Sequence, residues 1–148
     1  MTVRVIAHGF DPGGQTNLFL KEHNSAGAVV TFTGLVRSSP SDPITSLMLE
    51  CYPDLAINQV ETILAQGLTR FELLAATIIH RYGTMVPGDP IVQVMTMSPH
   101  REAAFEGAQF LMDYLKTDAP FWKKETGPTG TKWVDAKSAD DRAKARWK

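Results

Sequence analysis

Apolar residues recur with a helical period in the stretch between residues 98 and 118. They lie on one face, at spacings of four, seven, eight and eleven residues: Ala104, Ala108, Leu111, Met112 and Leu115. This spacing is typical of an amphipathic helix with one buried side. The rest of the chain can be organised around this helix, because basic residues gather at both of its ends.

Local signals set the expected ends of the helix. Ser98 is a favourable N-cap residue, and Pro99 suits the first helical position, where its missing N–H costs nothing. Pro120 disfavours helical geometry at the residue before it. We therefore expect a helix that begins at Ser98 and ends near Lys116 or Thr117.

Shorter apolar runs rich in β-branched residues predict strands. These runs cover residues 2–7, 27–33, 44–52, 75–81 and 91–97. Helices are predicted from Gln15 to His23 and from Pro53 onward. The second has an apolar face made by Leu55, Val60, Ile63 and Leu64. Residues 132–137 are interpreted as a last strand after a GPTG turn, and residues 138–148 as a short charged helix or a flexible tail.

The order of these elements indicates the fold class. Strands and helices alternate irregularly, and the segments 75–81 and 91–97 are spaced like a hairpin around Pro87, Gly88 and Asp89. This predicts an α+β fold with a mixed or antiparallel sheet, not a doubly wound fold. A chain of 148 residues without repeats is long enough to bury a core, so a single domain over residues 1–148 is expected.

Charge is distributed unevenly along the chain. The formal net charge is −1, but residues 1–115 hold 6 Lys and Arg against 11 Asp and Glu, whereas residues 116–148 hold 9 against 5. The positive end suits an anionic ligand or an acidic partner, and its interspersed acids argue against nucleic acid. No apolar run is long enough for a membrane span or signal peptide, and a single cysteine suits a reducing cytoplasm.

The candidate chemistry is a set of basic side chains. His100 and Arg101 fall in the first turn of the main helix, where free N–H groups and the positive end of the dipole favour an anion. Lys116 lies at its other end, and Lys123 follows the helix. Arg37 ends a predicted strand beside the polar stretch SSPSDP. Each residue alone has an ordinary structural interpretation, so only the combination indicates a site.

Other chemistry is weaker in the sequence. Cys51 lies in an apolar strand and is expected to be inert, as a buried small hydrophobe. The histidines at positions 8, 23, 80 and 100 lack the spacing of metal ligands, so no metal site is predicted. His80, within an apolar strand, is interpreted as a hydrogen-bonded structural residue.

Longer motifs carry a family resemblance. The stretch PHREAAFEGAQFLMDYLKTDAPFWKKE resembles the signature region of the molybdopterin synthase catalytic (large) subunit family. Upstream, GAVVTFTGLVR, LECYP and HRYGTMVPGD match the same family in the same order. The matches run from about Gly27 to Lys137 and so cover most of the chain.

The resemblance implies an α/β hammerhead-type fold with a small additional β subdomain. It also implies transfer of sulfur to cyclic pyranopterin monophosphate, which forms the dithiolene of molybdopterin. The sulfur arrives as a C-terminal thiocarboxylate on a small ubiquitin-like partner with a Gly-Gly tail. No cofactor is implied.

The family's site positions map onto specific residues. Catalytic roles are expected for Lys116 and Lys123. Substrate contacts are expected from Leu35, Val36, Arg37, His100, Arg101, Lys124, Glu125 and Lys137. Lys137 stands where an arginine is expected in the family, and a lysine keeps the charge but loses the bidentate fork.

Helix length adds a constraint of its own. His100 and Lys116 are sixteen residues apart, which corresponds to roughly 24 Å along a helix axis. One small pocket cannot easily reach both ends of the same helix, so we expect a homodimer with shared sites, within a heterotetramer that includes two small partners. The alternative is a non-catalytic module of the same shape that binds a phosphate, a nucleotide or a ubiquitin-like protein.

Overall fold

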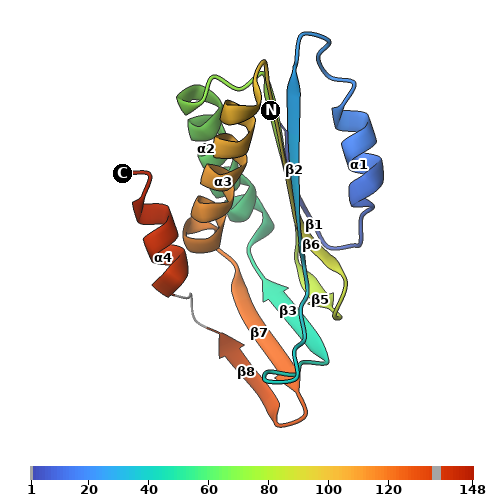
Figure 1. The fold of residues 1–148 in the computed structure, drawn as a ribbon. Coiled ribbons are helices and arrows are strands. Elements are labelled where there is room, and N and C mark those ends of the chain that lie inside the picture. The colour runs from blue at the N-terminus through green and yellow to red at the C-terminus, as the bar shows by residue number, and fades with distance from the viewer. Residues whose placement is uncertain (1, 135–137) are drawn as a thin grey trace.

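The computed structural model describes residues 2–134 and 138–148, which form two sheets (Figure 1). The larger sheet has the strand order β1-β4-β6-β2. Strand β1 (Thr2–Ile6) is parallel to β4 (Ala75–Arg81), and β6 (Pro90–Ser98) runs antiparallel to both β4 and β2 (Ala28–Leu35). The predicted mixed sheet is therefore confirmed.

A smaller sheet extends from one end of the larger one (Figure 1). Its order is β5-β3-β7-β8, and each neighbouring pair is antiparallel. The strands are β5 (Gly83–Met85), β3 (Ser46–Glu50), β7 (Trp122–Gly127) and β8 (Gly130–Val134). This sheet is the additional β subdomain that the resemblance implied.

Helices cover both faces of the larger sheet. Helix α1 (Pro12–Phe19) lies on one face, whereas α2 (Pro53–Arg70) and α3 (Arg101–Asp118) lie side by side on the other (Figure 1). The C-terminal helix α4 (Ser138–Ala145) packs against α3. Of the two expectations for the end of the chain, the charged helix is confirmed.

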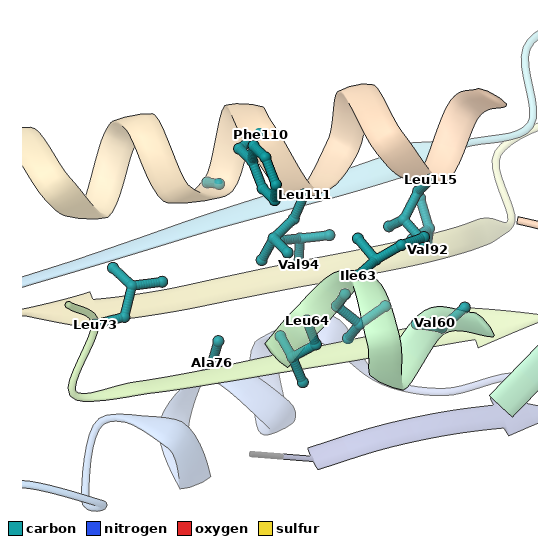
Figure 2. Packing of buried hydrophobic residues seen from close by; sticks show 12 residues of the cluster. Val60, Ile63, Leu64, Leu73, Ala76, Val92, Val94, Phe110, Leu111 and Leu115 are labelled. Carbon is teal, nitrogen blue, oxygen red and sulfur yellow. The ribbon is translucent and has the colours of Figure 1, made fainter. Parts of the chain in front are cut away.

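The main core lies between the larger sheet and the α2–α3 pair (Figure 2). Ile78 and Val94 project from neighbouring strands into this layer, where they meet Leu64 of α2 and Leu111 of α3, all with no exposed surface. The predicted apolar stripe of α3 is confirmed. On α2 the prediction is wrong for one residue: Leu55, in the first turn, is 45% exposed.

Some predicted helix ends were wrong. Helix α1 runs from Pro12 to Phe19 and not from Gln15 to His23, because residues 12–14 supply its first turn, with proline at the favoured first position. Helix α3 begins at Arg101, not Ser98, since Ser98 is still paired in β6 with Ala28.

Ser98 also caps differently from the expectation. Its buried hydroxyl donates to the carbonyl of His100 and does not cap free N–H groups, and His100 itself occupies the N-cap position. At the other end α3 stops at Asp118, and Ala119 is extended, as the residue before a proline should be.

The strands of the smaller sheet were the least predictable. Strand β3 is shorter than the expected segment 44–52, and β5 and β7 were not predicted. Strand β7 carries Lys123 and Lys124 in a polar segment whose pairing is decided by its neighbours β3 and β8. Strand β8 starts at the predicted GPTG turn and runs to Val134, and residues 135–137 of the expected strand 132–137 lie outside the described residues.

Candidate active site

A cavity of about 330 Å³ opens where the two sheets meet the C-terminal half of α3. The floor of the cavity is a row of paired residues across the larger sheet: Gly34 of β2, Val92 of β6 and His80 of β4. Helix α3 contributes Met112, Leu115 and Lys116. The smaller sheet contributes Leu47, Leu49, Lys123 and Val134. The volume is that of a small-molecule site.

Glycine at position 34 leaves the space above the floor of this cavity open. A Cβ atom there would lie 2.8 Å from Cγ1 of Val92, closer than such atoms approach in proteins. Any side chain at this position would displace Val92 or fill the cavity. The GLVR motif therefore has a steric reason for its glycine.

Lys116 and Lys123 reach the same cavity from different elements. Lys116 lies in the last turn of α3, and Lys123 is the second residue of β7, paired with Leu49 and Val134. Residues 119–121, with Pro120 at their centre, connect the end of α3 to the start of β7 (Figure 1). The predicted pair of lysines is thus brought together by the tertiary structure.

Successive side chains of a strand point to opposite faces of the sheet, so the two residues after Lys123 have different surroundings. Glu125 lies two residues on, and its Oε1 is 3.6 Å from Nζ of Lys123. Lys124 faces the other way, with its Nζ 5.4 Å from the centre of the Trp133 ring. Glu125 is therefore placed to orient Lys123, while Lys124 does not line the cavity.

His80 is a cavity residue whose position the sequence analysis did not anticipate. Its ring stacks on Phe121, with centres 3.9 Å apart and planes 12° from parallel. Its Nδ1 lies 3.0 Å from the carbonyl oxygen of Arg81. The expected hydrogen bond is confirmed, but the residue also borders the site. The signal that could have found it was the HRYG motif, which begins at this histidine.

The environment of His80 strongly disfavours its charged form. Burial, with a smaller contribution from the nearby charge of Lys116, lowers the pKa of the imidazole to about 4, against a raising effect of the hydrogen bond to Arg81. The ring is therefore neutral at neutral pH.

This pKa predicts a loss of stability in acid. Between pH 6.5 and about 4 the unfolded chain binds a proton at His80 that the folded chain does not bind, so the free energy of unfolding falls as the pH falls. The full effect at or below pH 4 is roughly 3 kcal/mol. Urea unfolding of the protein and of His80→Phe across this range measures it. An equal acid dependence in both proteins would contradict the prediction.

Among the other predicted site residues that the structure describes, Leu35 lines the cavity and is 55% exposed, whereas the rest do not line it. Val36 is 4% exposed and packs with Ile44, Leu47 and Met85. Arg37 follows it on the surface, where a polar loop begins.

Two of the remaining basic candidates lie at the far end of α3 from Lys116. His100 and Arg101 are exposed at the N-terminal end of α3, opposite the end that carries Lys116. Lys137 lies outside the described residues. A single copy of the chain therefore gathers Leu35, Lys116 and Lys123, and leaves His100 and Arg101 at the other end of the helix.

Comparison with known proteins now identifies the chain's relatives. The family described as "MoaE protein" matches residues 7–118. The chain belongs to the MoaE family. A relative from Rhizobium meliloti (strain 1021), "Molybdopterin synthase catalytic subunit", is 49% identical over 99% of this chain and 96% of its own length.

Solved structures share the fold of this MoaE family member. A MoaE protein from Burkholderia ambifaria MC40-6 is 42% identical, with a TM-score of 0.84 over 99% of this chain and 97% of that one. A second match, at 21% identity and a TM-score of 0.74 over 92% and 90% of the two chains, is described as a complex of subunits 1 and 2 of molybdopterin-converting factor from Helicobacter pylori 26695. At that identity the second likeness supports the fold alone.

Other chemistries find little support in this MoaE family member. Cys51 was expected in a buried strand, but it follows β3 and is only half-buried. Partial burial still raises the pKa of its thiol, which makes it a poor nucleophile. Residues 2–134 and 138–148 contain no group of three or more His, Cys, Asp or Glu side chains placed to hold a metal ion. Within the same residues, no helix combines the length and apolar character of a membrane span.

Proposed function

We propose that this chain is the catalytic subunit of a molybdopterin synthase. It would transfer sulfur from the C-terminal thiocarboxylate of a small ubiquitin-like partner to cyclic pyranopterin monophosphate. The observation that supports this most is the cavity with Lys116 and Lys123, in a chain 49% identical over nearly its full length to a molybdopterin synthase catalytic subunit.

The two lysines suit the chemistry of this transfer. A thiocarboxylate carries negative charge, and attack on it or by it develops further charge on oxygen or sulfur. Ammonium groups fixed at one wall of a cavity stabilise such charge without reorganisation during the reaction. Lysine amines also serve as nucleophiles and proton carriers. We assign both lysines to the reacting end of the partner's tail.

A small protein partner fits the surroundings of the cavity. Leu35 and Phe32 border its mouth with 55% and 43% of their surfaces exposed, and Trp133 of the nearby β8 is 55% exposed. Such apolar surface beside a cavity suits a protein tail that ends inside it. The solved complex from Helicobacter pylori 26695 contains two subunits of its converting factor. A reducing cytoplasm, where Cys51 stays free, suits this assembly.

The phosphate of the substrate requires a second copy of the chain. His100 and Arg101 lie at the start of α3, which separates them from Lys116 by roughly 24 Å. An isologous dimer could place the helix start of one copy beside the cavity of the other. We assign the phosphate to Arg37, His100 and Arg101, and the further contacts to Val36, Lys124, Glu125 and Lys137. Two such chains with two small partners make a heterotetramer.

Mixing two inactive variants tests this shared site. Lys116→Ala removes the charge at one helix end and Arg101→Ala removes it at the other, so each homodimer lacks part of every site. Mixed dimers contain one site without either substitution, and we expect up to about a quarter of wild-type activity after subunit exchange at equal amounts. Dithiolene formation measures it. Activity no higher than that of the separate variants would argue against sharing.

A turnover assay decides between this function and a non-catalytic binding module. The chain is incubated with cyclic pyranopterin monophosphate and the thiocarboxylated partner, and the dithiolene product is measured. Product formation by the wild-type chain supports the enzyme. Binding of both ligands without product would support the module.

A further inference from the structure

The ring of His80 is held from two sides, which fixes its orientation. Phe121 stacks on its face at 3.9 Å, and Phe121 belongs to the short connection between Lys116 and Lys123. The Nδ1 atom is tied to the carbonyl of Arg81 at 3.0 Å. A side chain with both its plane and one nitrogen fixed presents its other nitrogen in a defined direction.

That other nitrogen carries a lone pair. A carbonyl oxygen only accepts hydrogen bonds, so Nδ1 must carry the hydrogen, and Nε2 of the neutral ring is left as an acceptor. His80 borders the cavity with 9% of its surface exposed, so this acceptor lies at the cavity wall.

Charged groups from three elements border the same cavity as His80. Lys116 comes from α3 and acts on the ring electrostatically. Lys123, with Glu125 beside it, comes from β7, and Asp140 borders the same cavity from α4. A neutral acceptor next to Lys116 can orient the ammonium group without cancelling its charge, as a carboxylate would.

We propose that His80 is a positioning residue for the reaction, in which Nε2 accepts a hydrogen bond from the Lys116 ammonium group and aims it at the reacting carbonyl. This rests on the proposed function of the cavity. Phe121 completes the arrangement, because it holds the imidazole plane while it connects the two lysines along the chain.

Two substitutions at His80 separate positioning from packing. His80→Gln places a carbonyl oxygen near the position of Nε2 but loses the stack on Phe121. His80→Phe keeps an aromatic stack and loses the acceptor. Because His80→Phe removes a hydrogen bond to a charged group, we expect its kcat to fall by roughly 10- to 100-fold, with KM little changed. His80→Gln is expected to retain activity within a few-fold of wild type.

A purely structural role predicts the opposite order, since phenylalanine preserves the apolar packing better than glutamine does. Thermal unfolding of both variants shows whether each is folded at the assay temperature. If His80→Phe is at least as active as His80→Gln while both are folded, the proposal is overturned.

A measurement that leaves His80 intact provides the second test. Imidazole chemical shifts of ¹⁵N-labelled protein report both the tautomer and the pKa of His80 between pH 7.5 and 4. We expect hydrogen on Nδ1 at neutral pH, and a higher pKa of His80 in Lys116→Met than in the matched variant Lys123→Met. Hydrogen on Nε2, or the same pKa in both variants, would refute the proposal. Because this readout needs no turnover, it is independent of whether the chain forms dithiolene.

Discussion

Lys123→Ala is expected to slow dithiolene formation by about a thousandfold, the largest functional effect in this chain. The ammonium group of Lys123 borders the cavity, and Glu125 holds it at 3.6 Å. Alanine removes the charge without disturbing the backbone pairs that β7 makes with β3 and β8. The loss should therefore appear in kcat while the protein stays folded. Single-turnover assays with the thiocarboxylated partner measure it.

Lys132→Ala is the matched control for this substitution. Lys132 lies on the neighbouring strand β8, is exposed, and does not border the cavity. The control also removes one positive charge from the same hairpin, so a general electrostatic effect on the acidic or anionic partners would affect both variants. Equal losses in the two variants would show that net charge, and not the position of Lys123, supports activity.

Leu111→Ala is expected to lower the free energy of unfolding by about 3–5 kcal/mol. Leu111 is fully buried between α3, α2 and the larger sheet (Figure 2). It packs onto Gly67 of α2 so closely that a Cβ atom there would be 2.9 Å from its Cδ2. Two helices in such close contact cannot collapse easily into the space that alanine would leave. Urea unfolding at a fixed protein concentration measures the change.

Phe105→Ala on the same helix is its control. Phe105 is 61% exposed, so its removal leaves no cavity and should change stability by less than about 0.5 kcal/mol. A small loss for Leu111→Ala would show that the α2–α3 layer can repack around the gap. An equally large loss for Phe105→Ala would show that this exposed face is covered by another chain. The unfolding measurement would then be repeated over a range of protein concentrations.

Periodicity predicted the elements that carry the core. The stripe from Ala104 to Leu115 gave α3 its buried face because a helix repeats every 3.6 residues whatever it packs against. Pro120 predicted the end of α3 for a similarly local reason, because a proline ring disfavours helical geometry at the residue before it. The apolar runs that became β4 and β6 were equally clear, because both strands are covered on two faces.

Local signals failed where pairing partners decide the structure. Strand β7 is polar, and its residues become a strand because β3 and β8 supply hydrogen bonds on both sides. Ser98 has the chemistry of an N-cap, yet the ladder with β2 continues through it and delays the helix to Arg101. Propensity is a weak preference, and a continuous ladder outweighs it.

The sequence by itself determined the family and the α+β class, and it singled out Lys116 and Lys123 as candidates, because these depend on residue identity and on spacing along the chain. Only the tertiary structure showed that Lys116 and Lys123 share one cavity, that Lys124 faces away from it, and that His80 borders it. These facts depend on which strands lie side by side and on which face each residue takes. No local pattern in the chain encodes a neighbour that is forty residues away.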